Sequence, residues 1–253
     1  MGQNENTSEA KRISRTRWSY IFRLILRCLI LVFFVVLFFV RPEEFEILHG
    51  FNFFRRFSVL HVIWGLWMFD MILQLVPMRG MIALGSRKHY GISFRPIRER
   101  INRTVIRSHI KDLTRAAYRV FWIWVALLAV IGVLYFVGVL SKSMLFLISV
   151  VFFVCDLICV LIWCPFRLIM GNKCCTTCRI FNWDHLMMVT PMMFMGGFFA
   201  LSLLISAIAV YLLWEICVMV HPERFSYMSN EALQCSQCTD KLCTQYCKKL
   251  RRR

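Results

Sequence analysis

The sequence predicts an all-α membrane protein, a polytopic helical bundle of about five spans with a basic amphipathic interfacial helix and a small Cys-rich tail. Three observations predict this class. The chain has 253 residues, 59% of them hydrophobic, whereas an ordinary globular domain has about 45–50%. Apolar runs long enough to cross a bilayer recur along the chain. Lys and Arg gather in the segments between these runs.

The first third of the chain holds two predicted spans. Residues 1–17 are polar and then basic, and residues 18–77 carry both spans, the second over about 57–77. Arg23 and Arg27 lie in the first turns of the first span. Long basic side chains at such positions can extend to the membrane interface, so we expect both to do so.

Residues 78–116 form a long basic segment with ten Lys or Arg. After Pro96 its apolar residues recur every three to five positions, which is the spacing of one face of a helix. A basic amphipathic helix beside a bilayer is typical of the membrane interface. The segment therefore predicts an interfacial helix that precedes the next span.

Residues 117–163 predict a transmembrane hairpin that turns at Ser141-Lys-Ser143. The apolar stretch 186–220 is harder to interpret. As one helix it would be about 52 Å long, more than a bilayer core requires. It is either a long transmembrane helix or one broken at Gly196-Gly197, where paired glycines can end a helix or allow close packing.

The net charge of +17 favours contact with anionic lipids over nucleic acid, since no nucleic-acid recognition fold fits among the spans. The excess of Lys and Arg predicts an inner-membrane protein whose N-terminus and loops 78–116 and 165–185 are cytoplasmic. The tail, 221–253, carries seven Lys or Arg. Its charge favours the same side, whereas a single crossing by 186–220 would place it outside, and the sequence leaves both open.

Two groups of cysteines predict a metal centre. Cys174, Cys175 and Cys178 lie in the Cys-rich loop 164–185, where burial does not explain three thiols. The tail holds a C-x2-C-x4-C-x3-C pattern, formed by Cys235, Cys238, Cys243 and Cys247. Four thiolates close in sequence can surround an iron–sulfur cluster, and tetrahedral zinc accepts the same ligands. Free thiols or disulfides are the remaining interpretation.

The other five cysteines lie in apolar runs. Cys28 and Cys217 are isolated, and small buried side chains are the best interpretation for both. Cys155, Cys159 and Cys164 follow roughly helical spacing, which favours packing thiols. Cys164 is nevertheless placed where its span ends, next to Pro165 and just before the Cys-rich loop.

Two stretches resemble known families. CPFRLIMGNKCCTTCRIFNWDHLMM (164–188) resembles a family of uncharacterised bacterial membrane proteins, a likeness that implies membership but no activity. The tail spacing resembles one ferredoxin-type [4Fe–4S] half-motif, although Lys248 follows the last Cys where such motifs usually have Pro. In these motifs the fourth Cys often serves a neighbouring cluster. The resemblance implies that the loop thiols 174–178 are its counterpart, provided that both groups lie on one face of the membrane.

Three polar residues within the predicted spans are candidates for a separate site. His61 and Asp70 are nine residues apart, about 14 Å along a helix, so they do not pair directly. Asp156 could meet Asp70 or a basic group. Intramembrane ionisable side chains suggest a proton relay, although an interhelical hydrogen bond that fixes packing is the favoured interpretation.

The residues that follow the loop predict a helix start. Asp184 suits an N-cap, and Trp183 suits an anchor at the membrane interface.

These observations predict an integral membrane iron–sulfur protein in electron transfer, with a soluble donor and a membrane partner. A membrane scaffold with a structural zinc site of four cysteines is the alternative, and a small transporter that uses His61, Asp70 and Asp156 is a third. No catalytic residue is identified.

Overall fold

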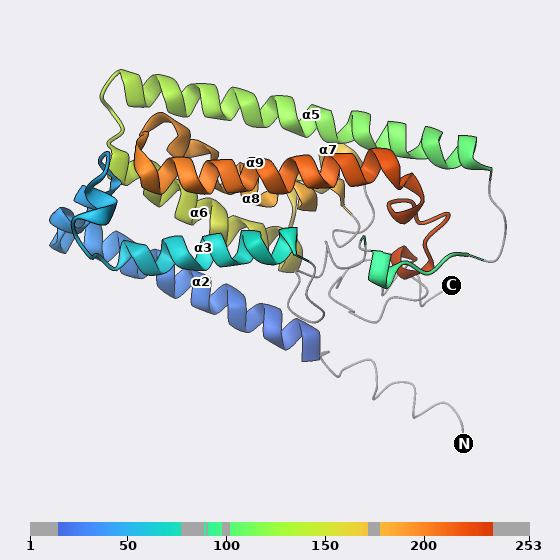
Figure 1. Cartoon of the computed structure of the whole chain (residues 1–253), viewed down its shortest axis with the longest axis horizontal. Coiled ribbons are helices and arrows are strands. Elements are labelled where there is room, and N and C mark those ends of the chain that lie inside the picture. Colours follow the sequence, from blue (N-terminus) through green and yellow to red (C-terminus); the bar gives the residue numbers. More distant parts are fainter. Residues whose placement is uncertain (1–14, 77–88, 90, 98–101, 172–177, 235–253) are drawn as a thin grey trace.

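The structure is a computed structural model that describes residues 15–76, 89, 91–97, 102–171 and 178–234. It confirms the all-α membrane class, because four helices are long and apolar enough to cross a bilayer. These are α2 (Arg15–Val40), α5 (Arg103–Phe136), α6 (Lys142–Leu161) and α9 (Gly197–Val220). Their axes follow the long axis of the molecule (Figure 1).

The second predicted span is shorter than expected. Helix α3 covers Leu60–Leu75, and its 16 residues reach about 24 Å, less than the thickness of a typical bilayer core. The residues before it fold into two 3₁₀ helices, η1 (Pro42–Leu48) and η2 (Asn52–Phe54). Helix α3 packs along α9, as Figure 1 shows. Part of its apolar surface is therefore covered by the neighbouring helix.

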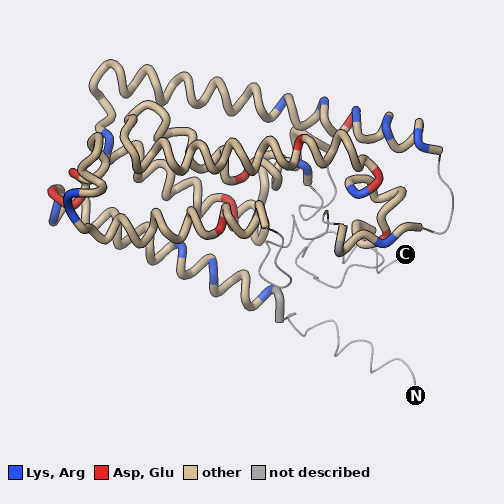
Figure 2. Tube along the Cα trace, viewed as in Figure 1, with Lys and Arg blue, Asp and Glu red and all other residues tan. Residues whose placement is uncertain are grey.

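The predicted interfacial helix and the third span form one continuous helix. Helix α5 has 34 residues, begins after Asn102, whose side chain accepts from the Thr104 amide at 3.0 Å, and contains no proline. Ile106 and Ile110 of its basic part are buried in the main core cluster. The amphipathic stretch therefore buries its apolar face against the protein, and its Lys and Arg follow one end of the helix (Figure 2).

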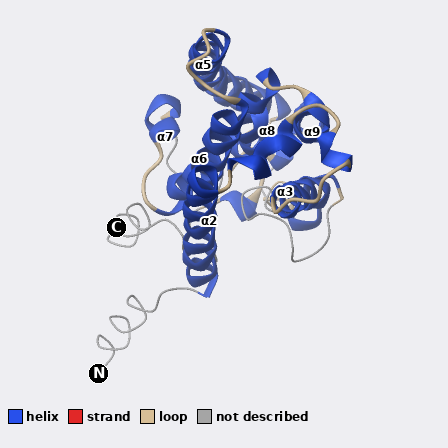
Figure 3. Cartoon of the chain, turned by 90° about the vertical axis from the view of Figure 1, so that its left-hand side faces the viewer, coloured by secondary structure: helices blue, strands red, loops and turns tan. Residues whose placement is uncertain are grey.

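The hairpin turn lies where it was predicted. Ser141 caps α6 by accepting from the Met144 amide at 3.3 Å. Helix α6 then packs against α2, and Figure 3, which views the bundle end-on, shows α2 beside α6 at one edge. The outer face of α2 is exposed and apolar, as expected for contact with lipid; its exposed side chains include Phe22, Leu29, Phe33 and Phe39.

The long apolar stretch 186–220 is broken. A short helix, α8 (Asp184–Val189), continues as η6 (Thr190–Phe194) to the end of the bundle formed by η1 and η2. Gly196 and Gly197 then adopt φ of +63° and +82°, a backbone conformation that glycine adopts without steric cost. The chain reverses there, and α9 returns along the whole bundle.

This reversal brings the start of the tail to the same end as the basic loop. Residues 222–224 (η7) lie against α5. The Glu231 amide donates to the Arg95 carbonyl at 2.8 Å, and Pro96 pairs with Asn230 in an isolated β-bridge. We call this end the polar end. It carries residues 91–97, the first turns of α5 and residues 221–234. The described start of the tail therefore lies at the same end of the bundle as the basic loop, which is the end that its charge favours.

Candidate functional site

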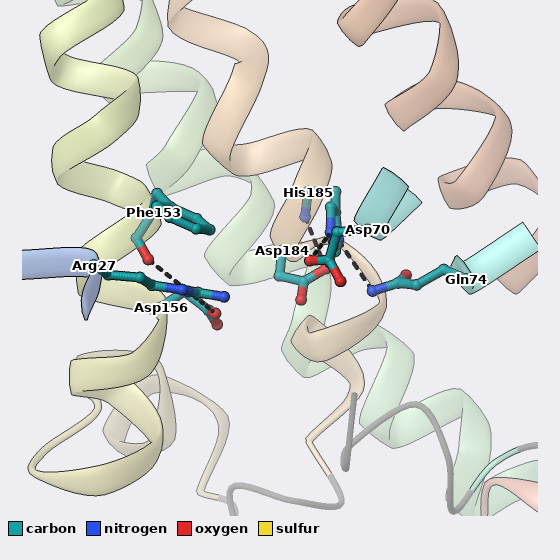
Figure 4. A network of polar contacts seen from close by, with 7 residues as sticks. All are labelled: Arg27, Asp70, Gln74, Phe153, Asp156, Asp184 and His185. Atoms are coloured by element: carbon teal, nitrogen blue, oxygen red, sulfur yellow. Dashed lines mark hydrogen bonds and ion pairs between the residues drawn. The ribbon is translucent and has the colours of Figure 1, made fainter. Parts of the chain in front are cut away.

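Five ionisable side chains form one layer near the C-terminal ends of α3 and α6 (Figure 4). They come from four helices: Arg27 from α2, Asp70 from α3, Asp156 from α6, and Asp184 and His185 from α8. Asp70 and Asp156 each precede the last residue of their helix by five positions, which is about 8 Å along the axis. We call these five residues the charged layer.

His185 lies between two carboxylates. Its Nε2 is 3.0 Å from Asp70 Oδ2, and its Nδ1 is 2.8 Å from Asp184 Oδ1. The amide of Gln74 lies 3.1 Å from the same Nδ1. The His185 side chain is 8% exposed. Because carboxylates only accept hydrogen bonds, the imidazolium form, with a proton on each nitrogen, satisfies both carboxylate contacts, and its Nδ1 then does not accept from the Gln74 amide nitrogen.

The second pair in the layer joins α2 to α6. The Arg27 guanidinium donates to Asp156 Oδ2 at 2.9 Å and to the Phe153 carbonyl at 2.6 Å. Its central carbon lies 3.8 Å from the centre of the Phe153 ring, a cation–π contact. The sequence predicted that Arg27 extends to the interface. It turns into the bundle instead, because it lies twelve residues after the start of α2, about 18 Å along the axis.

The two pairs interact electrostatically. Asp156 is attracted by Arg27 and His185 and repelled by Asp184, and Arg27 also attracts Asp70. With both bases charged, three carboxylates face two cations. Since charges inside a bundle are costly unless paired, the layer is a unit in which removal of one member affects the others.

A further ion pair fixes the end of the Cys-rich loop. Arg179, in η5 (Arg179–Asn182), donates to Glu215 of α9 at 2.7 Å. The indole of Trp183 donates to the other oxygen of Glu215 at 2.9 Å. Trp183 is 2% exposed, so the prediction of an interfacial anchor is wrong. The prediction of Asp184 as an N-cap also fails, since its carboxylate is engaged by the backbone and ring of His185.

A cavity of about 340 Å³ lies beside the charged layer, between α5, α6, α7 (Pro165–Met170) and α8. Asp156 and Asp184 of the layer form part of its wall. The rest of the lining is mainly aromatic, aliphatic and sulfur-containing. Four of the six cysteines in the described part of the chain line it, namely Cys155, Cys159, Cys164 and Cys178.

The positions of three cavity cysteines bear on thiol chemistry. Cys159 lies in the last turn of α6, Cys164 lies between α6 and α7, and both line the cavity. The Cys178 thiol is buried and donates to the Met170 sulfur at 3.5 Å. Cys178 lines the cavity, whereas Cys174 and Cys175, with which it was predicted to act, lie outside the described residues. None of the four cavity cysteines forms a disulfide with another described residue.

One predicted site residue, His61, does not join this site. It lies at the opposite end of the bundle, where its Nε2 is 2.9 Å from the Phe53 carbonyl oxygen and its ring stacks on Phe57. Asp70 and Asp156 both belong to the charged layer, although they bond to different bases. The three residues of the suggested transporter therefore do not form one site.

The other predicted metal ligands lie outside the described residues: Cys174, Cys175, Cys235, Cys238, Cys243 and Cys247. Within the part of the chain that the structure describes, no three His, Cys, Asp or Glu side chains gather as ligands for a metal ion.

No protein-family model matches the chain, and no curated protein or solved structure matches it. The resemblance of residues 164–188 to bacterial membrane proteins therefore stays a prediction.

Proposed function

We propose that the protein is an integral membrane electron-transfer protein whose redox chemistry is carried by sulfur at the polar end. The observation that carries this proposal is that Cys159 and Cys164, five residues apart, line one cavity. A dithiol needs two sulfurs that can approach to bonding distance. Cys164 follows the end of α6 by three residues and directly precedes α7, so the pair spans the turn between these helices.

The chemistry of such a pair requires proton acceptors. Oxidation of two thiols to a disulfide releases two electrons and two protons. Asp156 and Asp184 line the same cavity, and behind Asp184 lies His185, itself bonded to Asp70. The charged layer therefore provides acceptor oxygens within the membrane, close to the thiols. Intramembrane ionisable groups serve this purpose in proton relays.

A redox titration with mass mapping tests the dithiol. The full chain in lipid nanodiscs is equilibrated with mixtures of reduced and oxidised dithiothreitol, and its free thiols are alkylated. We expect Cys159 and Cys164 to lose alkylation together, in one two-electron step, and to appear in a single disulfide-linked peptide. Cys217→Ser, on α9 and away from the cavity, should leave that step unchanged. If Cys159 and Cys164 stay alkylated under the most oxidising mixture, the proposal fails.

The tail cysteines support a second sulfur centre. We propose that Cys235, Cys238, Cys243 and Cys247 bind a [4Fe–4S] cluster, with Cys174 and Cys175 as possible further ligands, and zinc as the alternative metal. This arrangement requires both groups on one side of the membrane. The described residues next to the two cysteine groups support this arrangement. Residues 222–233 pack on the polar end, and η5, directly after Cys178, is bonded to α9 near the same end.

Metal analysis tests this centre. We expect protein purified without air to contain about four irons per chain and to absorb visible light, as a cubane cluster does. Cys238→Ser should remove the metal, whereas Cys28→Ser, in α2, should retain it. About one zinc per chain without colour would favour the structural alternative, and absence of both metals would contradict the proposal.

The basic polar end also suggests an orientation. We propose an inner-membrane protein with the N-terminus, loops 78–116 and 165–185 and the tail on the cytoplasmic side, where anionic lipids attract Lys and Arg. A redox partner would then dock from the cytoplasm. A fluorescent protein fused after Arg253 should fluoresce, and alkaline phosphatase at the same position should be inactive. The reverse pattern would place the tail outside.

A further inference from the structure

The cavity that contains Cys159 and Cys164 has a lining suited to a flat, apolar molecule. Four aromatic side chains contribute to it: Trp124, Phe152, Trp163 and Phe166. Trp124 and Phe152 are in edge-to-face contact, with ring centres 4.8 Å apart. The volume, about 340 Å³, falls within the range of about 300–1,000 Å³ that is usual for small-molecule sites.

The surroundings of the cavity indicate that its ligand comes from the bilayer. Cys155, on α6, and Trp163, just beyond the end of α6, line the cavity and are both exposed. The same side of the cavity is otherwise formed by Phe152 and Ile158 of this membrane-spanning helix. A molecule that reaches the thiols from this side has to be soluble in lipid.

We propose that a lipid-soluble quinone binds in this cavity and oxidises the Cys159–Cys164 dithiol. The inference rests on the thiol function proposed above and names its electron acceptor. The aromatic side chains fit the face of a quinone ring. Asp156 and Asp184 can accept hydrogen bonds from the two hydroxyl groups of the product, a quinol.

The reaction balances without another reagent. The two S–H bonds break, and one S–S bond forms between Cys159 and Cys164. Two electrons and two protons leave the thiols. The two carbonyl oxygens of the quinone gain them and become hydroxyl groups. Thiol oxidation and quinone reduction are both two-electron steps, so one disulfide corresponds to one quinol.

The experiment uses the full chain, reduced and kept without air in lipid nanodiscs. Decylubiquinone is added, its reduction is followed by ultraviolet absorbance, and the disulfide is mapped by mass spectrometry. We expect one quinol for each Cys159–Cys164 disulfide, and no quinol from Cys159→Ser or Cys164→Ser. Diamide, a soluble thiol oxidant, is used in parallel to measure the reactivity of the pair without a quinone.

A matched pair of variants tests the location. Ile158→Trp fills the cavity, whereas Ile162→Trp adds the same side chain at an exposed position outside its lining. We expect Ile158→Trp to abolish the quinone reaction and retain the diamide reaction, and Ile162→Trp to retain both. Equal quinone rates in the two variants would overturn the cavity as the site.

The outcomes separate the two proposals. If diamide links Cys159 to Cys164 and decylubiquinone does not, the quinone proposal is overturned and the thiol function stands. If neither reagent forms the disulfide, both are overturned.

Discussion

Replacing His185 with alanine is expected to lower the free energy of unfolding by about 3 kcal/mol, because it leaves Asp70 and Asp184 facing each other without the base between them. The Asp184 side chain is only 14% exposed and cannot regain full hydration, whereas Asp70, at 38%, can do so in part. Asp70→Asn should cost less, since an amide oxygen can still accept from Nε2. Thermal or denaturant unfolding in detergent measures both.

His221 provides the matched control for this prediction. It pairs with Glu223 at 3.2 Å, but the two side chains are 40% and 41% exposed. Such exposed pairs contribute less than about 1 kcal/mol, so His221→Ala should unfold almost like the unmodified protein. Equal losses for His185→Ala and His221→Ala would show that the charged layer is not a buried unit.

Replacing Gly197 with alanine is expected to have a similarly large effect, about 3 kcal/mol, from backbone strain and overlap together. Its φ is +82°, and a Cβ there would lie 3.0 Å from the Gly50 nitrogen and 3.1 Å from the Gly50 oxygen. The same turn is held by the Phe198 amide, which donates to the Gly50 carbonyl at 3.1 Å. The substitution therefore separates the start of α9 from the loop between η1 and η2.

Gly138 isolates the contribution of that contact. Its φ of +85° is close to that of Gly197, yet nothing lies within 4 Å of a Cβ placed on it. Gly138→Ala should therefore cost about 1–2 kcal/mol, the strain of the backbone conformation alone. If the two variants unfold alike, the close approach of α9 to Gly50 contributes no stability. Unfolding curves measured under identical conditions give the difference.

Local composition was enough to predict the helices. A run of apolar residues forms a helix in lipid because its backbone groups have to be satisfied internally, so α2, α5, α6 and α9 follow from length and hydropathy. Composition did not predict where the short α3 begins. Its start is set by hydrogen bonds that Ser58 and His61 make with each other and with the preceding turns. The extent of α5 also needed the structure, because a basic amphipathic segment fits both an interfacial helix and the extension of a span.

The candidate site was predicted in part. Asp70 and Asp156 were recognised because charged residues in apolar runs are unusual, but Arg27 and His185 were not recognised as their partners. A signal for Arg27 was present, since it lies deep in an apolar run. His185 was visible beside the loop cysteines, yet only the position of α8 against α3 brings it to Asp70.

The order of residues thus specified a positively charged bundle of membrane helices, because hydrophobicity, length and charge act within short stretches of chain. Which residues meet was settled by the reversal at Gly196-Gly197 and by the packing of α8 among α3, α6 and α9. Contacts between positions more than a hundred residues apart, such as Asp70 with His185 and Arg27 with Asp156, depend on how helices pack, and no local pattern encodes that.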